Sequence, residues 1–157
     1  MMTVPGCRSL LVALAALAWS ALASAGEVRV DDAWARATLP GQKVAGVYMT
    51  LTSQAGGRLI GVESPSAPTA EIHEMRHQDG VMKMRRIESL ALPAGQPVKL
   101  APGGFHIMLL DIGQPLQPGQ QVSLTLLVEE AGERRSIPVK APVRAAAGAT
   151  GGGHEHH

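Results

Sequence analysis

This chain of 157 residues has a single cysteine, no asparagine and few aromatic residues. Aromatic residues make up 3% of it, and its 14 Lys and Arg nearly balance its 13 Asp and Glu. Without a basic stripe or interleaved aromatic residues, nothing here is typical of nucleic-acid binding. The absence of Asn excludes N-glycosylation sites. The motifs Gly-x-Ser-x-Gly, P-loop and His-Glu-x-x-His are also missing, so we expect a protein that is not an enzyme.

The one cysteine, Cys7, lies in a segment that we expect to be removed. Arg8 supplies a positive charge, Ser9 to Ala23 is a short apolar run, and Ala23-Ser24-Ala25 is a small-x-small cleavage signal. The pattern predicts a signal peptide over residues 1–25, a mature chain from Gly26 and export to a bacterial periplasm. The run is shorter than the about 20 residues of a membrane span, and an uncleaved anchor is the alternative. A lipoprotein cysteine would follow the run, whereas Cys7 precedes it.

Cleavage at Gly26 leaves a mature chain without cysteine. Loss of Arg8 lowers the basic residues from 14 to 13, which equals the 13 acidic residues. Without a thiol, the mature chain cannot form a thiolate zinc site, act as a thiol oxidoreductase or hold a blue-copper centre. Its length fits one domain with a core of its own.

Short β-prone runs separated by turn residues predict an all-β fold. The turns are marked by Pro and Gly, as in Pro93-Ala94-Gly95 and Pro102-Gly103-Gly104. No long apolar pattern with a period of 3.6 residues indicates a helix. We therefore predict seven to nine strands in a single antiparallel domain, a Greek-key β-sandwich or barrel, over residues 26–142, followed by a flexible Gly- and Ala-rich tail over 143–157. The expected strands are 28–35, 44–52, 58–62, 69–76, 81–87, 105–112, 121–129 and 135–139.

Two histidines and two methionines occur at a spacing that suggests a metal site. They are His73, Met84, His106 and Met108, separated by ten, twenty-one and one residues. Imidazole nitrogen with thioether sulfur suits a soft ion, whereas Mg²⁺ and Ca²⁺ prefer oxygen and Zn²⁺ rarely takes methionine. These four residues therefore predict a Cu(I) site. The alternative is that the methionines are core packing and the histidines lie at the surface.

The turn signal Asp79-Gly80 predicts a hairpin, and the length of its loop determines which of the candidate ligands lie opposite each other. A two-residue loop places Met75 opposite Met84, whereas a four-residue loop places His73 opposite Met84. Both registers leave these three side chains on one face, since side chains alternate along a strand. The two donors of the later strand likewise share a face. One ion could thus be reached from both, with Met75 as a candidate neighbour.

With these four residues the sequence resembles the periplasmic copper(I) chaperones called PCuAC, whose pattern is His-x10-Met-x21-His-x-Met. All four positions match, and the resemblance covers about residues 28 to 142. Four further segments also resemble this family: Asp32 to Thr38, Glu71 to Met75, Leu92 to Gly95 and Pro102 to Leu109. The resemblance implies a cupredoxin-like barrel that binds one Cu(I) and supplies the CuA centre of cytochrome c oxidase, often with a Sco-type thiol chaperone. A monomer is expected.

Other interpretations stay open. The last residues, His154-Glu155-His156-His157, form either a weak second site suited to Cu(II), an inert polar end or the remnant of a purification tag. For the whole protein, the alternatives are copper storage, copper tolerance or a structural β-sandwich whose Met and His residues are packing. A copper oxidase or reductase would need an open coordination position, which a complete set of two His and two Met does not offer.

Overall fold

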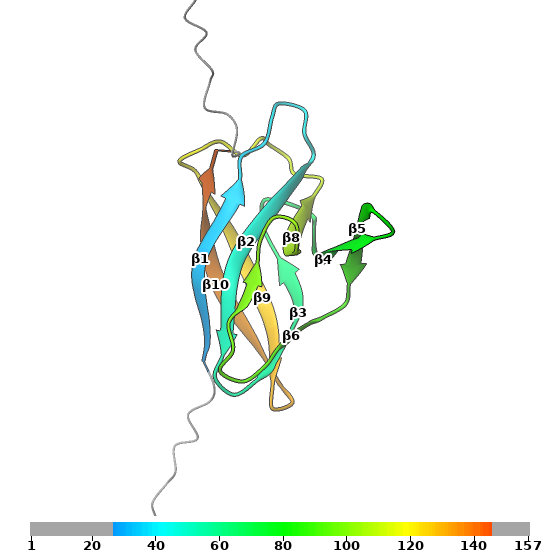
Figure 1. Cartoon of the computed structure of the whole chain (residues 1–157). Coiled ribbons are helices and arrows are strands. Elements are labelled where there is room, and N and C mark those ends of the chain that lie inside the picture. Colours follow the sequence, from blue (N-terminus) through cyan, green and yellow to red (C-terminus); the bar gives the residue numbers. More distant parts are fainter. Residues whose placement is uncertain (1–26, 146–157) are drawn as a thin grey trace, which may run out of the picture.

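Ten strands and no helix make up residues 27–145, which the computed structural model describes (Figure 1). The strands are β1 (Val28–Arg36), β2 (Val44–Ser53), β3 (Gly57–Glu63), β4 (Thr69–Gln78), β5 (Val81–Ile87), β6 (Leu90–Leu92), β7 (Val98–Leu100), β8 (Phe105–Leu110), β9 (Gln121–Glu130) and β10 (Glu133–Arg144). This range therefore holds no helix that is long and apolar enough to cross a membrane. The predicted signal peptide and the terminal histidines lie outside the described residues.

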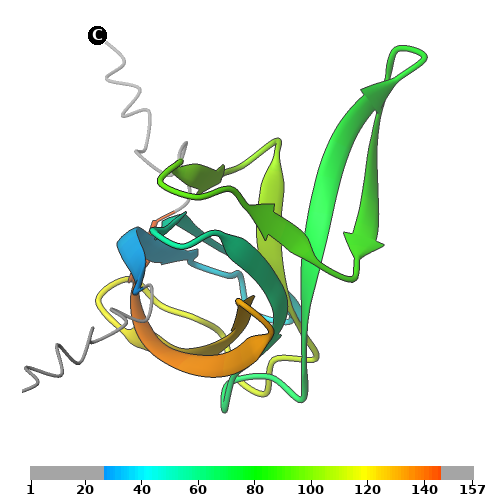
Figure 2. The ribbon, with the colours of Figure 1, turned by 90° about the horizontal axis from the view of Figure 1, so that it is seen from below.

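The strands form one sheet in the order β5-β4-β8-β2-β1-β10-β9-β3-β6, with β7 paired to β2. All pairs are antiparallel except β1 and β10, which run in parallel and join Ala35 to Val143. Seen from below, the sheet curves into a nearly closed barrel, and the β4–β5 hairpin projects away from it (Figure 2). The predicted all-β barrel is thus confirmed, and the sheet is mixed because β1 and β10 run in parallel.

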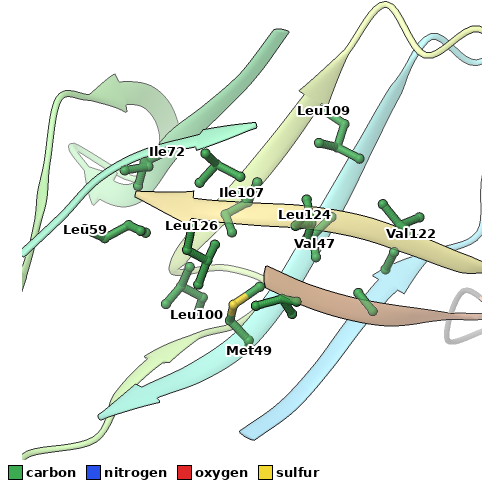
Figure 3. Packing of buried hydrophobic residues seen from close by; sticks show 14 of the residues in the cluster. Val47, Met49, Leu59, Ile72, Leu100, Ile107, Leu109, Val122, Leu124 and Leu126 are labelled. Carbon is green, nitrogen blue, oxygen red and sulfur yellow. The ribbon is translucent and has the colours of Figure 1, made fainter. Parts of the chain in front are cut away.

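The core fills the inside of this barrel, because every second residue of the long strands points inward. In β8, Ile107 and Leu109 are 0% exposed, and in β9 Leu126 is equally buried (Figure 3). Val128 of β9 is also 0% exposed. β10 ends at Arg144, and its Val143 is buried, so the sheet extends two residues beyond the boundary predicted at residue 142. The inward residues of β8 leave its alternate residues on the outer face of the sheet.

The β4–β5 hairpin has the register of the two-residue loop. Met75 lies opposite Met84, and the pair nearest the turn is Gln78 with Val81. Asp79 and Gly80 have φ values of 52° and 77°, as a type I′ turn requires. The register of the four-residue loop is therefore wrong.

Candidate metal centre

Three neighbouring strands bring the four predicted donors to one outer face of the sheet. His73 of β4 lies directly opposite His106 of β8, and Met75 of β4 lies opposite Met84 of β5. Met108 follows two residues after His106 on β8 and therefore points to the same side. Directly paired residues share a face, so all four donors lie outside the barrel on one side.

His106 and Met84 make the closest contact among these donors. The His106 Nε2 atom lies 3.2 Å from the Met84 Sδ atom, although the two residues are 22 positions apart. The His106 ring centre is also 5.6 Å from that of His73. The structure thus brings together a thioether from the projecting hairpin and both imidazoles.

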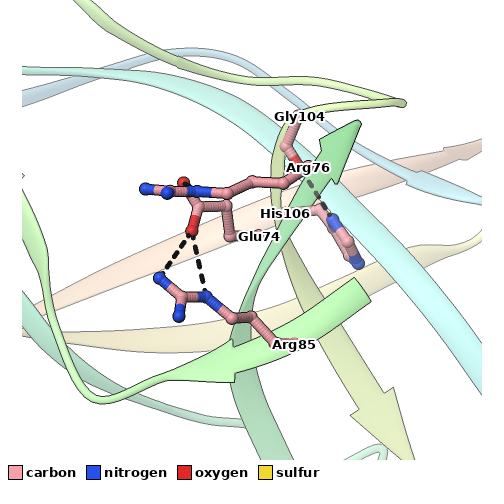
Figure 4. A network of polar contacts seen from close by, with 5 residues as sticks. All are labelled: Glu74, Arg76, Arg85, Gly104 and His106. Carbon is pink, nitrogen blue, oxygen red and sulfur yellow. Dashed lines mark hydrogen bonds and ion pairs between the residues drawn. The ribbon is translucent and has the colours of Figure 1, made fainter. Parts of the chain in front are cut away.

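The surroundings of His106 determine which of its nitrogens is free. Its Nδ1 lies 3.1 Å from the Gly104 carbonyl oxygen, which can only accept, so Nδ1 carries the proton (Figure 4). Burial lowers the pKa of His106 below its ordinary value of 6.5, and the neighbouring charge of His73 lowers it further, against the opposing hydrogen bond to Gly104. The ring is therefore neutral near pH 7 and presents the lone pair of Nε2.

In this arrangement two atoms with lone pairs face each other, and neither carries a proton that could form a hydrogen bond. The Nε2 lone pair of neutral His106 and the sulfur of Met84 are both acceptors, and at 3.2 Å they gain nothing from each other. A cation in reach of both would be bound by both. Among the described residues, no group of three or more His, Cys, Asp or Glu could hold a metal ion. A site here therefore depends on thioether sulfur, which favours soft ions.

His73 is held differently from His106. Its Nε2 lies 2.8 Å from Glu71 Oε2, while its Nδ1 is buried without a hydrogen-bond partner. Glu71 is two residues earlier on β4 and therefore lies on the same face. Sequence reasoning did not include Glu71 in the site, although this alternation would have placed it there.

A hollow of about 270 Å³ opens beside the donors. Its lining includes Met75, Met84, His106 and Met108, whereas His73 lies outside it. Tyr48 of β2 forms part of its wall, with its ring centre 6.4 Å from that of His106. The further lining residues are Arg36, Gln42, Val44, Gly46, Pro102 and Gly103. Solvent or an incoming ligand thus reaches three of the four predicted donors from this side.

Gly46 explains how the Tyr48 ring fits beside the hollow. A Cβ atom added to Gly46 would lie 2.5 Å from Tyr48 Oη and 2.9 Å from Tyr48 Cζ, so the ring covers the bare backbone of this glycine. The Trp34 ring stacks on Tyr48 at 4.6 Å between ring centres. No motif in the sequence indicated this aromatic wall, because it depends on the pairing of β1, β2 and β8.

Ion pairs stiffen the projecting hairpin on its other face. Glu74, next to His73 in sequence, points away from it and contacts Arg76 at 2.8 Å and Arg85 at 3.3 Å (Figure 4). The hydrogen bond and charge of Arg76, helped by Arg85, lower the pKa of Glu74 below its ordinary value of 4.5. The carboxylate is therefore ionised near neutral pH and links β4 to β5 without taking part in the donor cluster.

The fold and the donor set together define a cupredoxin-like β protein with a thioether and imidazole cluster on its outer face. The chain belongs to the LpqE-like family, described as "Putative lipoprotein LpqE-like", which matches residues 28–143. It is similar to "Putative lipoprotein Lxx21020" of Leifsonia xyli subsp. xyli, with 33% identity over 78% of this chain and 72% of the relative.

Solved structures agree with the resemblance to PCuAC, which is confirmed. The copper-bound PCuAC domain from PmoF2 shares 30% identity and a TM-score of 0.62, covering 78% of this chain and 97% of that domain. The solution structure of CuI-DR1885 from Deinococcus radiodurans shares 30% identity and a TM-score of 0.61, covering 81% of this chain and 85% of that protein.

Proposed function

We propose that this protein is a copper carrier that binds one Cu(I) through His73, Met84, His106 and Met108 and passes it to a partner by ligand exchange. The observation that carries the proposal is the pair of facing electron donors, His106 Nε2 and Met84 Sδ, 3.2 Å apart. The copper-bound PCuAC domain of PmoF2 and CuI-DR1885 support copper as the cargo and Cu(I) as its oxidation state. Four protein donors leave no obvious open position for catalysis, so we propose a carrier and not an enzyme.

The exposure of Met84 favours release as well as binding. This side chain is 50% exposed on β5, the end strand of the sheet in the described part of the chain. Its sulfur is a neutral ligand on a flexible side chain, and the hollow beside it admits a competing ligand. An acceptor could therefore replace one donor at a time while the others still hold the ion.

The cell compartment and the partners rest on the sequence and on the resemblance. We propose a periplasmic protein released by cleavage after residue 25, with a copper-binding domain ending near residue 142 and a tail beyond it. The lipoprotein description belongs to the relatives, whereas Cys7 of this chain precedes the apolar run. The proposed acceptors are the cytochrome c oxidase subunit that carries CuA and a Sco-type thiol chaperone. Storage or tolerance of copper is the alternative use of the same site.

The tail is proposed as a separate, weaker site. Its three imidazoles, His154, His156 and His157, suit Cu(II) better than a thioether site does. Because these residues follow a Gly-rich stretch, their removal should leave the barrel intact.

An anaerobic Cu(I) titration against a chromophoric competitor tests the proposed function. The protein begins at Gly26 and is compared with and without the residues after Thr150. Met84→Leu removes one sulfur and keeps its apolar volume. Met82→Leu is the matched control, since Met82 lies two residues earlier on β5 and is 46% exposed.

The expected result is one tightly bound Cu(I) with or without the tail, with weaker binding in M84L and unchanged binding in M82L. Equal affinities in M84L and M82L would remove Met84 from the site. Tight binding that disappears with the tail would transfer copper binding to the terminal histidines and leave the barrel as a structural or partner-binding domain.

A further inference from the structure

The two nitrogens of His73 have unequal surroundings. Nε2 lies 2.8 Å from Glu71 Oε2, and the two side chains are 12% and 17% exposed. An ionised carboxylate only accepts hydrogen bonds, so Nε2 must be the donor and carries a proton. In the neutral ring the lone pair is then on Nδ1, the buried atom without a hydrogen-bond partner.

A protonated ring would not resolve this imbalance. If Nδ1 also carried a proton, a buried N–H would lack an acceptor, which is unfavourable. In the neutral ring, a buried lone pair lacks a donor. A bound cation satisfies that lone pair, so the unpartnered Nδ1 is the atom of His73 best suited to a metal ion.

Glu71 is itself fixed in place. Its Oε1 contacts Arg86 Nη1 at 3.5 Å while its Oε2 contacts His73, so each carboxylate oxygen has its own partner. Arg86 lies opposite His73 on β5, and Met108 lies opposite Glu71 on β8. The carboxylate therefore sits among the donor-bearing strands with its orientation set from the hairpin.

We propose that Glu71 is a positioning residue that holds His73 so that its Nδ1 binds the ion, while His106 binds through Nε2. The two histidines would thus use different nitrogens, each set by the partner of the other nitrogen: the Glu71 carboxylate in one ring and the Gly104 carbonyl in the other. Carboxylate–histidine pairs of this kind orient the ring and raise its basicity as a ligand. The inference rests on the proposed copper site, because it assigns a role toward the same ion.

Two measurements on the mature protein test this inference. Long-range ¹H–¹⁵N NMR of the metal-free protein detects the Nε2–H of His73, and titration with Ag(I), a redox-inert substitute for Cu(I), shows which ring nitrogen shifts on binding. Cu(I) affinity is then compared between wild type, E71A and E74A. E74A is the matched control because Glu74 also lies on β4 and forms ion pairs, with Arg76 and Arg85, but points to the opposite face. E71L, which has no hydrogen-bond acceptor on its side chain, replaces E71A if that variant does not fold.

We expect a protected Nε2–H on His73 in wild type and E74A and its loss in E71A. Ag(I) should shift Nδ1 of His73 and Nε2 of His106. Cu(I) binding should weaken by about 10- to 100-fold in E71A and not in E74A. A shift at His73 Nε2, or equal losses in both variants, would overturn the inference and leave the copper site standing. Failure of the wild type to bind Cu(I) or Ag(I) at the barrel would overturn both proposals.

Discussion

Metal binding should slow hydrogen exchange in the β4–β5 hairpin far more than elsewhere in the barrel. In the described residues, β5 is an end strand that hydrogen-bonds to β4 alone, and six of its seven residues are exposed. Its opening requires no unfolding of the core. We therefore expect its amides to exchange through local opening in the metal-free protein.

The expected size of the effect follows from the strands that the donors connect. An ion held by Met84 of β5 and His106 of β8 would link two strands that are separated by β4. Opening of β5 would then have to break the site. A ligand at 100 times its Kd stabilises the closed form by about 2.7 kcal/mol, which slows exchange by about 100-fold.

Hydrogen–deuterium exchange measured by mass spectrometry, without metal and with Ag(I), provides the assay. Peptides covering Val81–Ile87 should show this slowing in the wild type, and M84L should show less of it. The turn at Ala131 and Gly132 is the internal control, because it joins β9 and β10, two strands that carry none of the donors. Equal slowing in both regions, or none in β5, would refute the proposed link between the strands.

Three further predictions concern stability in urea unfolding. Because burial lowers the pKa of His106 below 6.5, the unfolded chain binds that proton more readily, so stability should fall as pH drops from about 6.5 through the lowered value. The decline should be shallower in H106Q, and identical slopes would contradict this. Gly46→Ala should cost about 1–3 kcal/mol by displacing Tyr48, whereas Gly113→Ala, where an added Cβ meets nothing within 4 Å, should cost less. Leu109→Ala should cost about 2–5 kcal/mol without changing the Cu(I) affinity of the folded protein, and a loss of affinity in this variant would contradict the separation of core from site.

Local signals were sufficient to predict much of the fold. The Asp79-Gly80 turn fixes a two-residue loop, and Val81–Ile87 was predicted with the bounds that the structure has. β6 and β7 were missed because three residues are too short to show alternation. β10 was predicted too short, as residues 135–139, whereas the strand runs from Glu133 to Arg144. The parallel pairing of β1 with β10 is set by residues about a hundred positions apart and left no local signal.

Side-chain alternation along the strands was enough to predict which candidate ligands share a face, but not which strands lie side by side. Period two correctly placed His73, Met75 and Met84 on one face of the hairpin. The direct pairing of His73 with His106 depends on β4 meeting β8, which no motif encodes. The Tyr48 wall depends in the same way on long-range pairing. That the four donors bind copper stays a prediction until the titration is made.

The position of β5 has a consequence for self-association. An end strand exposes unpaired N–H and C=O groups, on which another chain can build a further strand and begin aggregation. β5 carries Lys83, Arg85 and Arg86 within seven residues, and all three are exposed. Two copies that met edge to edge would bring these like charges together, which is unfavourable. The strand that leaves Met84 accessible therefore carries positive charges that oppose edge-to-edge association of two copies.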